Sequence, residues 1–438
     1  MKWRWTLVVL LAMALAGCDT WFGDSPKAPL PGERISVLQH QQMLTADPQA
    51  GVEAIVLPVP VLNSEWAQAG GDSSHSMQNL QSGSGKLLWR ASIGEGVSDD
   101  RPVLPSPVVA DGRVFTVDTD NIASAFDVRT GKRLWERELA GKHDHSNAIP
   151  GGLAYQDGRV FVATGFGKVI ALDAKNGKPL WTRPVGTPIH TPPSVAGGRV
   201  FVITLENQLF ALNTSDGLDA WPPYQALAET ARLLGGADPA VEGNVVVAPF
   251  SSGDLTALRA DTGRPLWGES LAPARRTDEV SALAHIRARP VIDGDRVYAI
   301  SAGGILAAFD IRNGHRIWGK DIGGHQSPWL AGNQIYQVTN DNQLICVSTE
   351  TGRIHWVRPL PGFVDEKKRE KPLQWAGPVL TGDTLMLVGT DGKMLRVSAY
   401  DGQIIGKTSL AEHFSVAPVI ADGITYLLDD DGHLYAYR

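Results

Sequence analysis

The chain alternates apolar and polar residues over short runs, and turns that contain glycine or aspartate separate these runs. "RVFVAT" at 159–164 and "IALDA" at 170–174 have the length and the residue types of β-strands. Tight turns such as Asp111-Gly112 and Asp157-Gly158 join neighbouring runs. The pattern predicts an all-β protein made of four-stranded antiparallel meanders.

One turn, followed by a tryptophan, recurs along the chain. "TGKRLW" at 130–135 returns as "NGKPLW" at 176–181 and as "TGRPLW" at 262–267. The spacing is close to the period of about 40–50 residues that propeller blades show, and a large wedge is needed where one blade covers the next. We therefore interpret these tryptophans as structural residues that dock neighbouring blades: Trp89, Trp135, Trp181, Trp221, Trp267, Trp318 and Trp356, with Gly406 in the eighth place.

The two ends of the repeat array complete each other. The last copy, which ends at Arg438, has three strands, and the stretch 84–94 is a fourth strand with no blade before it. Pairing them would leave no open sheet edge. The sequence thus predicts an eight-bladed β-propeller over 63–438, closed by strand 84–94.

The leader predicts export and a lipid anchor. Residues 1–17 have a basic start and a short apolar core, which is typical of a secretory signal peptide. The signal ends in "LAGC", which resembles the lipobox of bacterial lipoproteins, so we expect acylation, with palmitate, at Cys18. The proline-rich stretch 18–62 lacks sustained periodicity and is expected to form the anchor and a flexible tether.

Composition narrows the function classes. The net charge of −7 gives no electrostatic footprint for nucleic acid or for an anionic lipid surface. The mixed-sign run "DEKKREK" at 365–371 predicts a solvated loop. If Cys18 carries lipid, Cys346 has no disulfide partner in the chain, and its alternating strand predicts a buried residue.

Signals for catalysis or metal binding are weak. The chain has no G-x-S-x-G elbow and no phosphate-cradling glycine loop, and the acidic stretches "DTDN" at 118 and "DDDG" at 429 are typical of hairpin turns. Several histidines lead into innermost strands without a short ligand motif, and "HDH" at 143–145 is the best metal candidate among them. We expect no enzymatic activity, no cofactor and no metal. The alternative to the last expectation is a metal site formed by histidines, and the candidates are His143, His145, His190, His285 and His325.

Two connections exceed what the repeat requires. The loops 226–239 and 275–289 each link the last strand of a blade to the first strand of the next. They belong to consecutive blades and carry apolar residues outside the strand pattern, flanked by arginines, as interface cores do. We predict a partner-binding surface there, with the cap of a blade interface as the alternative; its residues are Leu227, Arg232, Leu233, Leu234, Arg275, Arg276, Leu283, His285, Ile286 and Arg287.

The repeat resembles a known family. The unit "DG-x-V-(F/Y)…L-x-A-(L/F)-D…x-G-x-x-x-W" is similar to the tryptophan-docking repeat of the quinoprotein (PQQ) dehydrogenase superfamily over residues 66–438. "EWAQAGGDSSHSMQNL" at 65 is similar to the segment that opens such propellers. The lipoprotein signal, the single domain and the short blades resemble the BamB family of the outer-membrane β-barrel assembly (BAM) machinery.

The resemblance implies a scaffold lipoprotein. It implies that the chain binds the periplasmic POTRA domains of BamA beside other BAM subunits and aids insertion of outer-membrane proteins, with the unfolded outer-membrane proteins as a further partner. The family's Leu-x-Leu-Arg segment falls near 232–234, and its paired aspartates fall near His285 and Arg287. The alternative is a periplasmic PQQ dehydrogenase, in which adjacent cysteines clamp the cofactor; this chain has no adjacent cysteines. Outer-membrane placement is expected, although Asp19 resembles an inner-membrane retention signal.

Overall fold

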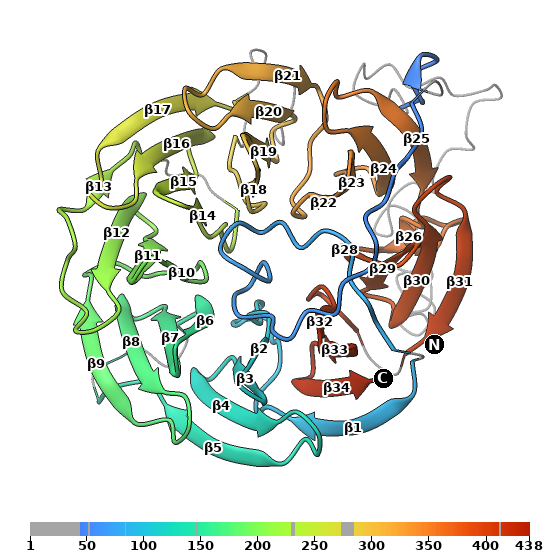
Figure 1. The fold of residues 1–438 in the computed structure, drawn as a ribbon. Helices are drawn as coiled ribbons and strands as arrows, with labels where there is room; N and C mark the ends of the chain where they lie inside the picture. The colour runs from blue at the N-terminus through green and yellow to red at the C-terminus, as the bar shows by residue number, and fades with distance from the viewer. Residues whose placement is uncertain are drawn as a thin grey trace, which may run out of the picture. The chain divides into compact units, whose positions relative to one another are not determined.

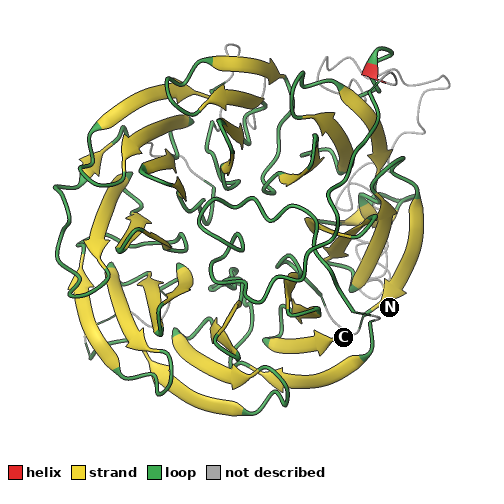
Figure 2. Ribbon diagram, in the orientation of Figure 1, coloured by secondary structure: helices red, strands yellow, loops and turns green. Residues whose placement is uncertain are grey.

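The alternating runs form strands that pair with their neighbours in chain order. The computed structural model describes residues 44–50, 53–83, 85–142, 144, 148–228, 233–272, 284–410 and 413–438. The unit from Thr45 to Arg438 contains eight four-stranded antiparallel sheets, set as blades around a central axis (Figure 1). Strands make up nearly all of its regular structure (Figure 2). The expected all-β, eight-bladed propeller is confirmed.

Seven blades are continuous meanders in which the first strand is innermost. They are β2–β5 (Val108–Ala110, Arg113–Val117, Ile122–Asp127, Arg133–Glu138), β6–β9 (Gly152–Gln156, Arg159–Thr164, Lys168–Asp173, Pro179–Pro184), β10–β13 (Ser194–Ala196, Arg199–Ile203, Gln208–Asn213, Tyr224–Gln225), β14–β17 (Ala240–Glu242, Val245–Pro249, Asp254–Arg259, Pro265–Ser270), β18–β21 (Val291–Asp293, Arg296–Ile300, Leu306–Asp310, Arg316–Lys320), β22–β25 (Trp329–Ala331, Gln334–Val338, Gln343–Ser348, Ile354–Pro359) and β28–β31 (Trp375–Thr381, Thr384–Gly389, Lys393–Ser398, Ile404–Ser409).

The eighth blade joins the two ends of the array. Its inner strands are β32 (Val419–Ala421), β33 (Ile424–Leu428) and β34 (His433–Tyr437), and its outermost strand is β1 (Leu87–Ser92), antiparallel to β34. The predicted closure by 84–94 is therefore confirmed, and the ring has no free sheet edge at the junction.

The charged run at 365–371 is more ordered than expected. It lies in a two-stranded hairpin, β26 (Phe363–Asp365) and β27 (Glu370–Pro372), instead of a plain loop. The guanidinium of Arg369 lies 5.2 Å from the centre of the Phe363 ring, and Asp365 accepts hydrogen bonds from the amides that follow it. These local contacts stabilise the turn although the sequence carries no apolar pattern there.

Each docking tryptophan contacts the glycine turn of the next blade. The indole Nε1 donates to a carbonyl of that blade at 2.7–3.2 Å, and the ring lies over the glycine of the recurring turn. The turn and the tryptophan of the repeat are thus the two sides of one contact; the pairs are Trp89–Gly131, Trp135–Gly177, Trp181–Gly217, Trp221–Gly263, Trp267–Gly314, Trp318–Gly352 and Trp356–Gly402.

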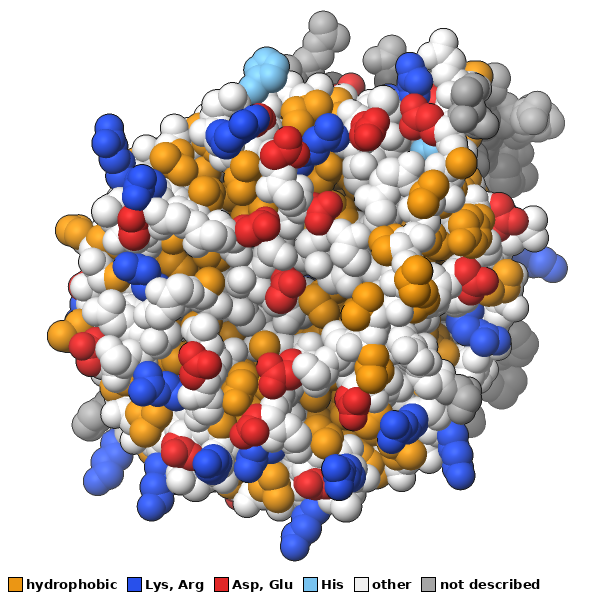
Figure 3. Space-filling view, viewed as in Figure 1, with side chains coloured by type: hydrophobic (Ala, Val, Ile, Leu, Met, Phe, Trp, Pro, Cys, Tyr) orange, Lys and Arg blue, Asp and Glu red, His pale blue; other side chains and the backbone are white. Residues whose placement is uncertain are grey.

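A segment before the first strand closes one end of the axis. Residues 61–83, here called the crossing segment, run across the ring (Figure 1). They form hydrogen bonds with the innermost strand of every blade, and the centre of this face is filled (Figure 3). The residues contacted are Val109, Tyr155, Val195, Val241, Ile292, Trp329, Leu380 and Ile420.

The compact unit begins earlier than expected. Asp47 exchanges backbone and side-chain hydrogen bonds with Ile354 at 2.8 and 2.9 Å, and the amide of Val56 donates to Asn333. Residues 45–62 therefore belong to the propeller unit, whereas the sequence had suggested a tether up to 62. The signal peptide, Cys18 and Asp19 lie outside the described residues. Among the described residues, no helix has the length and apolarity that crossing a bilayer requires.

Candidate partner-binding face and axial cavity

The two long connections lie on the same face of the propeller. One links β13 to β14 and the other links β17 to β18, so both pass from the outermost strand of a blade to the innermost strand of the next. The blades involved are consecutive (Figure 1). We call the end of the ring that carries these connections the loop face.

The first connection exposes leucines on the loop face. The side chain of Leu227 is 68% exposed and that of Leu234 is 43% exposed, whereas Leu233 is partly buried. The carbonyl of Leu227 accepts a hydrogen bond from Asn207 Nδ2 at 2.5 Å, and the amide of Leu233 donates to His285 Nδ1 at 3.0 Å. Exposed leucines on a fixed backbone are suited to contact with another protein.

The returning arm of the second connection is buried, contrary to expectation. Ile286 is 1% exposed and packs in a core cluster with Phe309 and Trp267, although it lies outside the strand pattern. His285 is 5% exposed, and its Nδ1 accepts a hydrogen bond from the amide of Leu233 at 3.0 Å. Both residues stabilise the junction of two blades and are not available to a partner. The sequence could not show this, because the arm has no strand period.

Four predicted interface residues cannot be placed. Arg232, Arg275, Arg276 and Leu283 lie outside the described residues. Arg287, which we expected beside the apolar residues on the surface, instead lines a cavity on the propeller axis.

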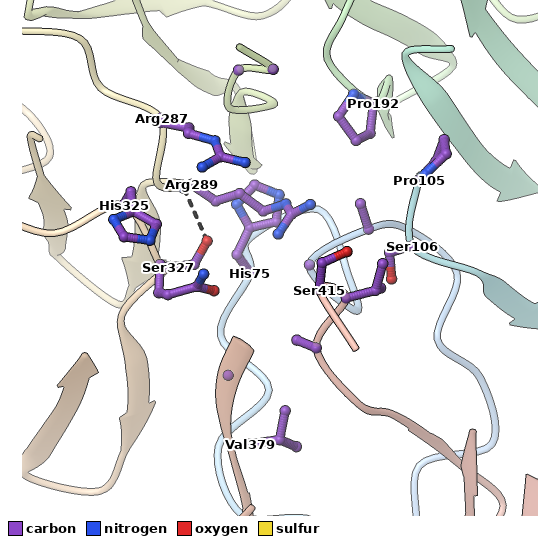
Figure 4. Close-up of a pocket in the computed structure, with 18 of the residues that line it drawn as sticks. His75, Pro105, Ser106, Pro192, Arg287, Arg289, His325, Ser327, Val379 and Ser415 are labelled. Atoms are coloured by element: carbon purple, nitrogen blue, oxygen red, sulfur yellow. Dashed lines mark hydrogen bonds between the residues drawn. The ribbon is translucent and has the colours of Figure 1, made fainter. Parts of the chain in front are cut away.

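This axial cavity has a volume of about 210 Å³ (Figure 4). Its walls come from residues just ahead of innermost strands, such as Ser106 before β2, Arg289 before β18 and Ser415 before β32. Its floor is the crossing segment, including Trp66 and His75. The outermost-to-innermost connections arrive at the starts of these strands, so the cavity faces the loop face.

The lining of the cavity is cationic on one side. Arg287, Arg289 and His325 project into it from neighbouring connections, opposite Ser106 and Ser415 (Figure 4). The lining residues include no Asp and no Glu. The arrangement therefore favours a negatively charged group in the cavity.

One buried carboxylate lies behind this lining. Asp238 is 0% exposed; its Oδ1 accepts from Arg289 Nε at 2.5 Å, and its Oδ2 lies 3.2 Å from His75 Nε2. Burial raises the pKa of Asp238, but the charge of Arg289 and then that of His75 outweigh burial, and the pKa lies below its ordinary value. The triad ties the floor of the cavity to the two long connections.

Burial and a neighbouring arginine lower the pKa of two basic groups in the lining. Burial and then the neighbouring Arg289 lower the pKa of Arg287. Burial and then Arg287 lower the pKa of His325, whose Nδ1 lies 3.3 Å from Asn340 Oδ1. A bound anion would relieve this repulsion.

The predicted metal candidates do not assemble into a site. His143 and His145 lie outside the described residues; His190 and His325 line the axial cavity, and His285 lies beside His190 in a smaller pocket. Among the described residues, no group of three or more His, Cys, Asp or Glu side chains is placed to hold a metal ion.

The carboxylates of the two acidic turns accept hydrogen bonds from residues close by. Asp118 accepts hydrogen bonds from the amides of Ile122 and Glu95, and burial raises the pKa of Asp118. Asp429, 0% exposed, accepts from the amide of His433 and from the hydroxyl of Tyr435. These carboxylates are already bonded within the blades, as the turn interpretation expects.

The residues present do not fit a pyrroloquinoline quinone with its calcium ion. The axial cavity lacks the carboxylates that Ca²⁺ prefers as ligands. Cys346 is buried in β24, where its Sγ lies 3.2 Å from Gln334 Oε1, and burial raises the pKa of its thiol well above the usual value. We derive no reaction through such a cofactor.

An eight-bladed propeller with tryptophan-docked blades is a repeat protein of the quinoprotein-like class. A family model of the outer membrane protein assembly factor BamB matches residues 58–147 and 138–358, which is more than half of the chain. The chain belongs to this family. The quinoprotein dehydrogenases are related to it by fold.

Relatives with the same description occur in several bacteria. The outer membrane protein assembly factor BamB of Yersinia pestis is 26% identical over 356 residues, which span 80% of this chain and 88% of that protein. The Escherichia coli K12 protein is 25% identical over 388 residues, 80% of this chain and 87% of that protein. The Xanthomonas campestris protein is 23% identical over 478 residues, 99% of this chain and 97% of that protein.

Solved structures share the fold. BamB from Moraxella catarrhalis matches with a TM-score of 0.64 and 19% identity over 80% of this chain and all of that chain. The quinohemoprotein alcohol dehydrogenase from Comamonas testosteroni also matches with a TM-score of 0.64, with 16% identity over 85% of this chain and 80% of that chain. At these identities the likeness concerns the architecture alone.

Proposed function

We propose that this protein is a non-enzymatic scaffold lipoprotein that aids the assembly of β-barrel proteins in the outer membrane. In this proposal the propeller binds the periplasmic POTRA domains of a BamA-like protein, beside other subunits of the assembly machinery. Its membership of the BamB family supports the proposal, because the relatives are described as outer membrane protein assembly factors.

The proposed organisation follows from the leader and from the start of the compact unit. It comprises a signal peptide over 1–17, a lipid anchor at Cys18 with a tether up to residue 44, and a propeller from Thr45 to Arg438. The anchor would hold the propeller at the periplasmic face of the outer membrane.

The observation that carries the binding surface is the exposure of Leu227 and Leu234 on the loop face. Both lie in one of the two connections that exceed the needs of the repeat, and backbone hydrogen bonds hold Leu227 itself and Leu233 beside Leu234. A partner that covers them removes apolar surface from water. Of the ten predicted interface residues, we therefore keep the leucines of the first connection and exclude the buried Ile286 and His285.

The test is co-purification of the BamA-like protein with the tagged full chain from detergent-solubilised membranes. Leu234→Asp should reduce binding by about thirtyfold, since a buried interface anchor contributes about 2 kcal/mol. Leu266→Asp is the matched control, because Leu266 is 42% exposed but lies on the outermost strand β17. Equal binding by both variants and the wild type would mean that the loop merely caps a blade interface.

A further inference from the structure

Arg287 is a partly buried cation that has no counter-ion among the described residues. Within the described residues, no carboxylate pairs with its guanidinium, whereas Arg289 two residues later is paired with the buried Asp238. Its guanidinium lies near Gly235 of the first connection, where an added Cβ would lie 3.7 Å from Arg287 Nε. Removing a guanidinium from water without a partner is unfavourable, so this position favours a bound anion.

The cavity supplies the other features of a carboxylate site. The planar guanidinium of Arg287 can bind a carboxylate with two parallel hydrogen bonds. His325 lies beside it, and Ser106 faces it across the cavity (Figure 4). A volume of about 210 Å³ has room for a carboxylate on a short aliphatic stem, and not for a folded element.

The rim of the cavity identifies the source of the carboxylate. Gly235 lines the cavity and directly follows Leu234, which is 43% exposed on the loop face. A polypeptide that covers Leu234 therefore has its chain at the mouth of the cavity, within reach of Arg287. A free small anion would make no use of this continuity with the apolar surface.

We propose that the axial cavity is a carboxylate-binding socket, in which Arg287 receives an acidic side chain of the polypeptide that docks on the loop face. This inference rests on the proposed function for the identity of that polypeptide. The cation-lined cavity itself does not depend on it, and the two are tested separately.

The first experiment measures the charge preference of the cavity. In the full chain, Ser106→Cys is treated with an anionic sulfonate or a cationic trimethylammonium methanethiosulfonate, and labelling is followed by mass spectrometry of the peptide that carries residue 106. The ratio of the anionic to the cationic labelling rate should be about tenfold higher at Ser106→Cys than at Thr182→Cys, which is exposed on β9. The preference should be lost in Arg287→Gln, and citrate should protect the cysteine. Equal ratios at both cysteines overturn the proposal.

The second experiment identifies the occupant. Purified POTRA domains of the BamA-like protein should protect Ser106→Cys from the anionic reagent, and Arg287→Gln should weaken their binding about tenfold. Arg312→Gln is the matched control, because it removes the same charge from a 75% exposed arginine. Protection by citrate without protection by bound POTRA domains overturns the polypeptide source. If the POTRA domains do not bind at all, the proposed function fails, although the charge preference stands.

Discussion

The indole of Trp221 lies directly over Gly263 of the next blade: a Cβ added to Gly263 would lie 2.5 Å from Cδ2 of the ring. The same indole donates a hydrogen bond from Nε1 to the carbonyl of Ala260 at 3.1 Å. Glycine is needed at this turn for two reasons, the close approach of the ring and a φ of 69°.

This relationship predicts the effect of a single methyl group. Gly263→Ala should lower the free energy of unfolding by about 3 kcal/mol, from left-handed backbone strain together with the clash against the indole. Gly243→Ala is the control, because its φ is 55° but no atom lies within 4 Å of the new Cβ. It should lower the free energy by about 1 kcal/mol. Denaturant titrations measure both, and equal losses would show that the indole contact does not constrain the turn.

Removal of strand β1 should destabilise the whole propeller. Deletion of residues 84–94 exposes the edge of β34, which β1 covers along five paired positions. Deletion of residues 19–43 removes no residue of the compact unit from Thr45 to Arg438. Thermal melts should therefore show a large decrease in melting temperature for the first deletion and nearly none for the second. A third deletion, of residues 45–60, should lower the melting temperature where deletion of 19–43 does not, because it removes the hydrogen bonds between Asp47 and Ile354.

The buried Asp238 should make stability dependent on pH. Its pKa in the folded state lies below the ordinary 3.8, so its contribution is present above that value and is lost as the pH falls through the lower folded pKa. Asp238→Asn should lower stability at neutral pH by about 3–5 kcal/mol, because Arg289 loses its counter-ion.

The same variant should lose less stability than the wild type when the pH is lowered from 5 to 2, as followed by urea denaturation. The control is Asp261→Asn, which removes an exposed ion pair with Arg259 and should leave the neutral melt nearly unchanged. An identical acid dependence in the wild type and Asp238→Asn would contradict the role of the buried triad.

Lipidation is predicted at Cys18. Cys18→Ala should release the protein from the membrane fraction, or leave it uncleaved, while the melting temperature of the propeller stays the same, because the anchor lies outside the compact unit. Fractionation together with mass spectrometry of the N-terminal peptide measures this. A cleaved variant that remains in the membrane fraction would contradict the assignment.

The repeat made the architecture predictable. The alternation of residues such as those in 159–164 and the recurring tryptophans specify strands and blade contacts locally, and both periods survive in the sequence without any knowledge of neighbours. Closure by β1 was predictable for the same reason, since a missing strand at one end matches a surplus strand at the other.

The site was less predictable because it depends on long-range contacts. Ile286 lies outside any strand period, yet the next blade buries it. The crossing segment has no periodicity either, because successive parts of it contact different blades. The position of Arg287 on the axis follows from that assembly, and no local pattern indicates it.

Closure by β1 and β34 also determines when the protein can complete its fold. The chain is synthesised from its N-terminus, so β1 emerges hundreds of residues before the strand that it pairs with. Until His433–Tyr437 emerges, the nascent propeller has two unpaired edges, and contacts so distant in sequence form slowly. This assembly factor is therefore itself exposed to aggregation through unpaired strand edges until its last strand pairs, as an unclosed β-barrel is.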